Sequence, residues 1–211
     1  MQEFNNEVFE ILKKVGAIVS ASHFVGVSDL HFDTYINKDA LLPHTEEVSK
    51  ICKIFAEKYK DKDIEVVAAP ALGGIILSQW VAHHLTELTG REVLGVYTEK
   101  TINKNQIFTR GYDEYVTDKK VLVVEDNVTT GGSVMKVVKA VQNAGGKIAG
   151  VCVMVNKDPK NVNAQTLGVP FEALSELSII SYTATDCPLC KAGIPINTKF
   201  GHGKKYLESK K

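Results

Sequence analysis

One run of the sequence, residues 121–133 (VLVVEDNVTTGGS), combines an apolar strand, two adjacent carboxylates and a hydroxyl- and glycine-rich loop that opens a helix. Such a loop offers unpaired backbone N–H groups and the positive end of a helix dipole, and Gly131 and Gly132 let an anion approach the backbone closely. The run therefore predicts a phosphate cradle. Glu125 and Asp126 would point to different sides of the strand end and suit the two vicinal hydroxyls of a ribose, or a cation bound to them.

The phosphate-binding interpretation competes with a plainer one, in which Gly131-Gly132 is only a strand-to-helix turn beside two solvated acids. The ordered combination of strand, acid pair and hydroxyl loop favours the cradle. The run has neither the Gly-Lys-Ser/Thr of a P-loop nor the Gly-x-Gly-x-x-Gly of a dinucleotide-binding fold.

The composition of the 211 residues, with 44% hydrophobic and 24% charged side chains, is typical of one soluble globular domain. Lys plus Arg (25) balance Asp plus Glu (25), so no global basic field is available to hold nucleic acid. No apolar run approaches the roughly 20 residues of a membrane span, and the first residues do not resemble a signal peptide. We therefore expect a cytoplasmic protein without nucleic-acid or membrane partners.

The elements that must position the motif alternate along the chain. Helices are predicted over residues 3–14 (with Phe4, Val8, Ile11 and Leu12 on one face), 44–59, 75–88 and between Gly132 and Gly145, and strands over 33–37, 64–69, 93–97, 121–124 and 148–155. Continuous apolar strands alternating with helices predict a parallel sheet covered on both faces. The polar segment 98–118 shows little periodicity and by itself reads as a solvated hairpin.

The run at 121–133 resembles the phosphoribosyl-diphosphate (PRPP) signature of the type I phosphoribosyltransferases. Three further segments are similar to the orotate phosphoribosyltransferase branch. Residues 69–75 (APALGGI) resemble its diphosphate-binding loop. Tyr97-Thr98-Glu99-Lys100 and residues 108–112 (FTRGY) resemble its flexible catalytic loop, and residues 28–38 occupy the place of its base-binding loop.

The resemblance extends over about residues 23 to 203 and implies a type I phosphoribosyltransferase fold. This α/β fold is a parallel five-stranded sheet with helices on both faces, a core of about 44–158, and a small hood from about 1–43 and 159–205. It implies transfer from PRPP to orotate with Mg²⁺ carried by PRPP, giving orotidine 5′-monophosphate and diphosphate in a homodimer with shared active sites. The residues it implies are catalytic Lys100, Glu125 and Asp126; PRPP-binding Ala71, Gly73, Gly74, Lys100, Arg110, Glu125, Asp126, Asn127, Val128, Thr129, Thr130, Gly131, Gly132 and Ser133; and base-binding Ser28, Tyr35, Thr129 and Lys157.

Two positions depart from the family pattern. Asp29 stands where the base-binding loop usually has glycine, and Lys157 stands where an arginine usually clamps the orotate carboxylate. Lysine keeps the charge but loses the bidentate fork. These departures leave two alternatives open: a phosphoribosyltransferase acting on another nucleobase, and a PRPP-sensing regulator without catalysis.

Cys187-Pro188-Leu189-Cys190 resembles the C-terminal segment of one subgroup of these enzymes. A Cys-x-x-Cys pair can form half of a zinc site or a redox pair, but among nearby residues only His202 suggests itself as a further ligand. We therefore expect a structural turn with packed thiols and assign no metal ligands.

Overall fold

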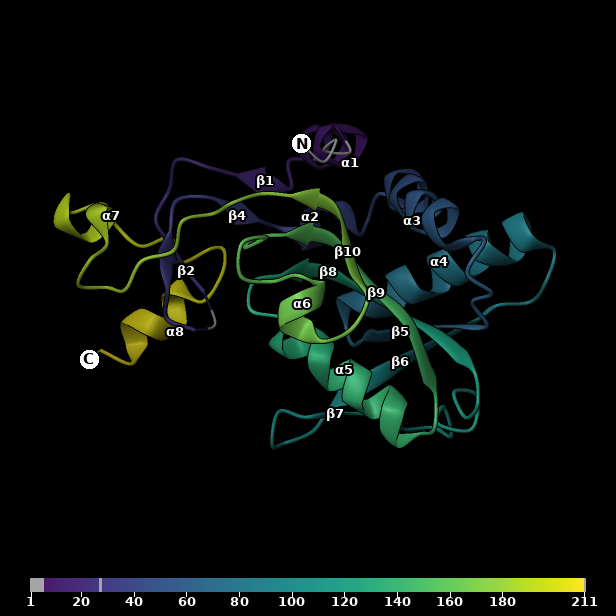
Figure 1. Cartoon of the computed structure of the whole chain (residues 1–211). Helices are drawn as coiled ribbons and strands as arrows, with labels where there is room; N and C mark the ends of the chain where they lie inside the picture. The colour runs from purple at the N-terminus through teal and green to yellow at the C-terminus, as the bar shows by residue number, and fades with distance from the viewer. Residues whose placement is uncertain (1–5, 27, 211) are drawn as a thin grey trace.

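The computed structural model describes residues 6–26 and 28–210 and centres on a six-stranded sheet (Figure 1). The strand order is β10 (Phe171–Glu176), β9 (Lys147–Asn156), β8 (Lys120–Val128), β5 (Val66–Pro70), β6 (Leu94–Lys100) and β7 (Gln106–Ile107). The first five strands are parallel, whereas the short β7 pairs antiparallel with β6. The predicted five-stranded parallel sheet is therefore present, with one added edge strand.

Helices cover both faces of this sheet because alternate side chains of its strands point to opposite sides. Leu122 and Val124 of β8 lie in the core shared with α1 (Asn6–Lys14), α3 (Thr45–Tyr59) and α4 (Gly73–Thr89). Val121 and Val123 lie in the second core, against α5 (Gly132–Asn143). Strands buried on both faces explain the continuous apolar runs that predicted a parallel sheet.

The fifth parallel strand comes from a part of the chain that the sequence assigned to the hood. Phe171–Glu176 forms β10 beside β9, so the core sheet continues beyond residue 158. The strand predicted over residues 33–37 is instead the short β4 (Tyr35–Ile36), which pairs with β1 (Ile18–Val19) outside the central sheet. An edge strand contacts fewer apolar neighbours, and β10 accordingly lacks the continuous apolar run that marks β8.

The predicted helices are confirmed with small shifts of their ends. Val8, Ile11 and Leu12 of α1 are buried as expected, while Phe4 lies outside the described residues. Within the described part of the chain, no helix is both long and apolar enough to cross a bilayer.

The hood combines segments from both ends of the chain. It contains β1 and β4, the pair β2 (Phe24–Val25) and β3 (His31–Phe32), α2 (Lys38–Leu41), α7 (Pro188–Lys191) and α8 (Gly203–Glu208), whereas the short α6 (Ala164–Leu167) precedes β10 in the core. Single β-bridges from His23 to Ile196 and from His31 to Tyr182 connect the two ends. Figure 1 shows α7 and α8 beside β2, away from the helices of the sheet.

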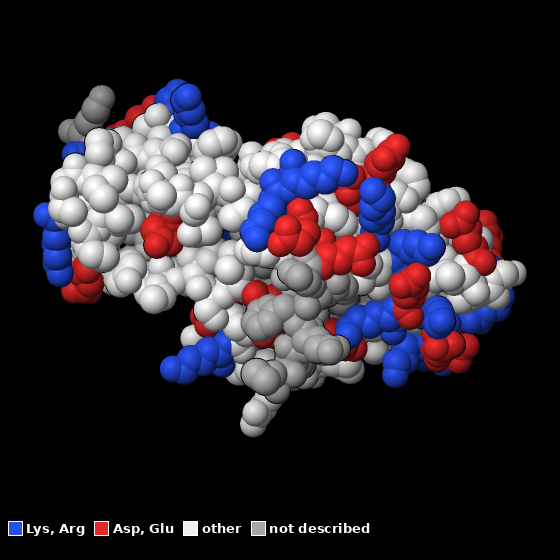
Figure 2. All heavy atoms as spheres, turned by 90° about the horizontal axis from the view of Figure 1, so that it is seen from above, with Lys and Arg blue, Asp and Glu red and all other residues white. Residues whose placement is uncertain are grey.

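The upper face of the molecule carries charges of both signs. Over the side of α1 and α3, Lys14 and Lys50 both pair with Glu47, and Figure 2 shows positive and negative side chains interspersed there. The hood side of the same face is largely uncharged. This face therefore lacks the continuous basic surface that binding to nucleic acid requires.

Candidate active site

The carboxyl ends of β5 and β8 bring two of the predicted loops together. Glu125 and Asp126 lie within β8 rather than after it, because the strand continues to Val128. Gly73, which follows β5, is so close that a Cβ added to it would come within 3.0 Å of Asp126 Oδ2. Ligands of open parallel sheets bind at this edge, so the contact places the predicted diphosphate loop beside the acid pair.

Glu125 is buried and held by two hydrogen bonds. The backbone N–H of Asp126 donates to its Oε1 (3.1 Å), and Ser133 Oγ donates to its Oε2 (3.3 Å). Burial, together with the charge of Asp126, raises the pKa of Glu125 to about 8. Burial therefore favours the protonated form of this carboxyl group in the free protein, and an arriving cation would favour release of the proton.

Asp126 forms an ion pair that sequence reasoning missed. Lys38 Nζ, at the start of α2, lies 3.0 Å from Asp126 Oδ2. A Cβ on Gly73 would come within 2.8 Å of the same ammonium nitrogen, so a larger residue there would displace the ion pair. Lys38 lies at the end of the segment compared with the base-binding loop, but a single lysine beginning a short helix carries no signal of its partner.

Tyr35 and Lys157 belong to the same electrostatic neighbourhood. Burial lowers the pKa of the half-buried Lys157, and the negative charge of Asp126 opposes this shift. Burial raises the pKa of Tyr35, and Asp126 adds to this shift while Lys38 opposes it. Two of the predicted base-binding residues therefore lie around the acid pair. A partly desolvated ammonium group is suited to pairing with an incoming anion.

The loop before β3 explains one departure from the family pattern. Asp29 has a φ of 58°, in the left-handed region that glycine enters freely and aspartate tolerates better than most residues. Its backbone N–H donates to Gly26 O at 3.2 Å. Asp29 thus preserves a turn for which glycine would be the usual choice. Ser28 is exposed in this turn, and the described contacts do not bring it to Tyr35 or Lys157.

The predicted phosphate loop follows β8 directly and begins α5. Gly131 is the residue before the helix and has a φ of 76°, and among the described residues no side chain caps this helix. Thr129, Thr130, Gly132 and Ser133 are exposed, and the hydroxyl of Ser133 donates to Glu125. The helix end can therefore receive an anion through its first N–H groups.

The last two residues of β8 connect the acid pair to this loop. Val128 is buried, and Asn127 is partly buried with a side-chain oxygen that has no hydrogen-bond partner among the described residues.

A cavity of about 670 Å³ opens beside the ion pair of Lys38 and Asp126. Its lining includes Lys38, Ala71, Leu72, Gly73, Ile76 and Lys100. Gly74, the next residue of the diphosphate loop, is buried, and a Cβ added to it would lie 2.8 Å from Ala69 Cβ. A second cavity, of about 380 Å³, lies along β10 and is lined by other residues.

The predicted catalytic loop is a hairpin formed by β6 and β7. Lys100 pairs with Gln106 across it and reaches the larger cavity. Arg110 is exposed, and its Nε donates to Glu99 Oε1 at 2.9 Å. The described lining of the cavity includes Lys100 but not Arg110, so this conformation assembles one of the two predicted loop cations.

Comparison with known proteins identifies the family to which the chain belongs. The family described as phosphoribosyl transferase domain matches residues 37–168, from the end of β4 through α6. Orotate phosphoribosyltransferases from Pelotomaculum thermopropionicum and Thermotoga maritima are 38% and 35% identical to the chain. They cover 90% and 93% of it, over 94% and 98% of their own lengths. The chain belongs to the orotate phosphoribosyltransferase family.

Solved structures of phosphoribosyltransferases share the fold of this family member. The Mycobacterium tuberculosis orotate phosphoribosyltransferase in complex with inorganic phosphate aligns with a TM-score of 0.61 at 24% identity, covering 84% of this chain and 91% of that one. A phosphoribosyltransferase from Corynebacterium diphtheriae aligns with a TM-score of 0.60 at 26% identity, covering 83% and 96%. The type I phosphoribosyltransferase fold expected from the motifs is thereby confirmed.

Proposed function

We propose that this protein transfers the phosphoribosyl group of PRPP to orotate, giving orotidine 5′-monophosphate and diphosphate. The observation that carries the proposal is the convergence of the diphosphate loop, the acid pair and the partly desolvated Lys157 at one edge of the sheet. Orotate differs from uracil by a carboxylate, and Lys157 supplies a cation for it. The family relationship to orotate phosphoribosyltransferases supports the same substrate.

The two ends of PRPP meet different parts of this edge. The exposed donors of Thr129–Ser133 and the start of α5 receive the 5′-phosphate, and Glu125 with Asp126 accepts hydrogen bonds from the ribose hydroxyls. The diphosphate lies in the cavity beside Ala71–Gly74, where Lys38 and Lys100 provide positive charge.

The reaction breaks the bond between C1′ and the diphosphate oxygen while a ring nitrogen of orotate bonds to C1′ and gives up its proton. Negative charge grows on the departing diphosphate as positive charge grows on the ribose ring. Lys100 stabilises the former charge, and the two carboxylates lie beside the latter. Closure of the β6–β7 hairpin would bring Arg110 to the same group and exclude water.

We also propose that Mg²⁺ enters with PRPP. The acid pair fits such an ion, because the mutual repulsion that contributes to the raised pKa of Glu125 is relieved by a nearby divalent cation. When bound, Mg²⁺ neutralises part of the charge on the diphosphate. Loss of diphosphate release on adding EDTA, with recovery on adding Mg²⁺, is the expected result.

A homodimer with shared active sites is proposed from the hairpin. Lys100 is exposed, and Ile102 at the turn is fully exposed. A second copy could cover this apolar tip and receive the cation. We further propose that the enzyme acts in the cytoplasm, because a highly charged substrate such as PRPP does not cross membranes unaided.

The decisive experiment measures diphosphate release from PRPP with orotate, uracil, adenine or hypoxanthine as acceptor. Uracil is the matched control because it lacks the carboxylate. We expect turnover with orotate and at most a hundredth of that rate with uracil. Faster turnover with a purine would replace orotate by another base, and PRPP binding without release from any base would favour a sensing role.

A further inference from the structure

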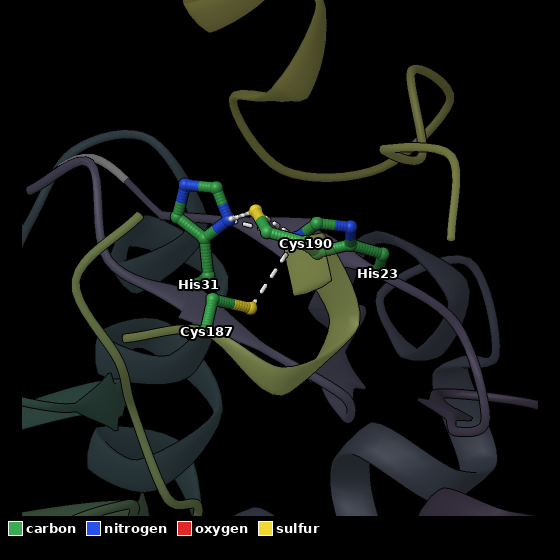
Figure 3. Close-up of side chains that lie close together, drawn as sticks. All are labelled: His23, His31, Cys187 and Cys190. Atoms are coloured by element: carbon green, nitrogen blue, oxygen red, sulfur yellow. Dashed lines mark hydrogen bonds between the residues drawn. The ribbon is translucent and has the colours of Figure 1, made fainter. Parts of the chain in front are cut away.

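Four potential metal ligands meet in the hood, outside the active site. His23 Nε2, His31 Nδ1 and the sulfur atoms of Cys187 and Cys190 all lie within 4.8 Å of one another (Figure 3). Cys187 Sγ is 3.7 Å from His23 Nε2, and Cys190 Sγ is 3.8 Å from His23 Nε2 and 3.4 Å from His31 Nδ1. The partners of the cysteine pair are thus two N-terminal histidines and not His202, which the sequence suggested.

The hydrogen bond of His23 fixes which of its ring nitrogens faces the cluster. Its Nδ1 lies 2.7 Å from the carbonyl oxygen of Ile194, so Nδ1 carries the proton and donates it. Nε2 then presents a lone pair to the two sulfur atoms. Ligand histidines in metal sites show this arrangement, with the second ring nitrogen donating to a carbonyl or carboxylate.

His31 is fully buried and incompletely satisfied without a further partner. Its Nδ1 lies 2.7 Å from His23 Nε2 and donates to it, since that nitrogen carries no proton. Its Nε2 is buried and has no hydrogen-bond partner among the described residues. Two imidazoles and two thiols therefore face one another in a largely buried space. Burying these polar groups costs free energy unless a bound group satisfies them.

Three of the distances among the four atoms match a tetrahedron around zinc. Zinc bonds of about 2.0–2.3 Å to nitrogen and sulfur place the ligand atoms roughly 3.3–3.8 Å apart. These three distances between sulfur and nitrogen are 3.4 to 3.8 Å and lie in this range. The contact between the imidazoles, 2.7 Å, must open by about 0.6 Å to reach the same geometry.

We propose that His23, His31, Cys187 and Cys190 bind one Zn²⁺ ion in a closed structural site. Binding releases the two thiol protons, and the proton of His31 moves from Nδ1 to Nε2, so two thiolates balance the charge of the ion. All four positions are taken by protein ligands, which is the arrangement of structural rather than catalytic zinc. A neutral, fully coordinated ion satisfies the four ligand atoms that face one another.

The site would join the two ends of the chain within the hood. His23 immediately precedes β2, His31 begins β3, Cys187 precedes α7 and Cys190 lies in it. Both histidines already carry the single β-bridges to the C-terminal segment. The two also flank the loop that contains Ser28 and Asp29. Zinc would therefore hold both ends of this loop, which belongs to the segment that resembles the family's base-binding loop and which, if the proposed function holds, acts on the base.

The first test measures zinc in the intact protein, expressed with zinc and purified without chelators. Mass spectrometric metal analysis is expected to give about one zinc per chain, falling to about a tenth or less in Cys190→Ser. His202→Gln is the matched control and is expected to retain the ion. Wild-type protein without zinc after reconstitution, or equal loss in His202→Gln, would overturn the site.

Cobalt replacement supplies a readout that does not depend on activity or on zinc contamination. Co²⁺ bound by two thiolates and two imidazoles gives a sulfur-to-metal charge-transfer band and the visible bands of tetrahedral coordination. Both are expected in the wild type and not in Cys190→Ser. A spectrum of octahedral Co²⁺ would contradict the proposal. So would protein that fails to take up zinc and whose mass is two hydrogens lower, which indicates a Cys187–Cys190 disulfide.

The positional consequence is tested with chelator-treated wild type. Removing the ion is expected to lower the melting temperature and to raise the KM for orotate about tenfold, with less than a twofold change in PRPP affinity. Readdition of Zn²⁺ should restore both. Equal changes for both substrates would overturn the role at the base loop. Zinc binding with no transfer to any base would instead refute the proposed function and leave the metal site intact.

Discussion

The carboxyl edge of the central sheet and the histidine–cysteine cluster of the hood assemble polar groups in opposite ways. Most groups at the sheet edge come from one continuous run, Glu125 to Ser133, joined by the loop after β5. The cluster draws its four groups from three segments that are up to 167 residues apart. Chemistry carried by one run can be recognised before folding is known, whereas scattered groups acquire meaning only when the chain brings them together.

The two regions also differ in their openness. The sheet edge holds carboxylates and lysines around a cavity of about 670 Å³, and exposed donors follow it at the start of α5. In the cluster three of the four residues are buried and all four point at one another (Figure 3). An open edge admits a substrate and releases a product, whereas a closed cluster fixes the positions of the segments that carry it.

The largest effect is expected from Lys100→Ala, which tests the open character of the sheet edge. In the proposed mechanism Lys100 contacts the diphosphate most strongly as its charge grows, so kcat should fall about 100-fold with little change in PRPP affinity. Steady-state kinetics and calorimetry measure the two quantities. Lys104→Ala, at the turn of the same hairpin, should change neither by more than about twofold. Equal losses in kcat and affinity would show that Lys100 only binds the ground state.

The next largest effect concerns the carboxylate of orotate. Lys157→Ala should raise the KM for orotate by the equivalent of about 1.5–3 kcal/mol, because it removes a charged hydrogen-bond donor. Lys157→Arg should preserve or improve binding, since its fork can form two parallel hydrogen bonds. An unchanged KM in Lys157→Ala would place the carboxylate elsewhere and weaken the assignment of this edge to orotate.

Gly132→Val tests whether the predicted phosphate loop binds PRPP. A Cβ at this position would meet only Thr130 Oγ1, at 3.7 Å, among the described neighbours, so a side chain can enter the space before the helix. PRPP affinity measured by calorimetry should fall about tenfold, which corresponds to about 1.4 kcal/mol. Gly132→Ala should lose less. Gly131 is a poorer test, because its φ of 76° and its approach to Leu167 would strain any replacement.

The last prediction is a pH dependence of stability at the acid pair. The folded protein keeps the Glu125 proton up to about pH 8, whereas the unfolded chain loses it near the ordinary value of 4.5. Stability from this group is therefore complete at low pH and is lost as the pH rises through that interval. Melting temperatures without PRPP or Mg²⁺ should fall more steeply with rising pH in the wild type than in Glu125→Gln. Glu114→Gln, at an exposed position, should follow the wild type, and equal slopes in wild type and Glu125→Gln would refute the raised pKa.

Local sequence determined the elements whose signals lie within a few residues. The apolar run of β8, the glycines that begin α5 and the helical faces of α1 and α3 are patterns of this kind, and they correctly predicted the parallel sheet. The position of the predicted phosphate loop at the start of α5 was predictable for the same reason, because strand, acids and loop are consecutive. Membership of the family followed from that run and was confirmed by the relatives.

Tertiary structure decided what depends on distant partners. The sequence around Lys38 does not indicate that it pairs with Asp126. The sequence of β10 does not indicate that this strand joins the central sheet. The convergence of His23 and His31 on Cys187 and Cys190 is likewise set by how the two ends of the chain cross in the hood. Neighbouring residues determine whether a segment forms a helix or a strand. The partner of a side chain depends on which distant segments the fold brings together, and no short stretch of sequence carries that information.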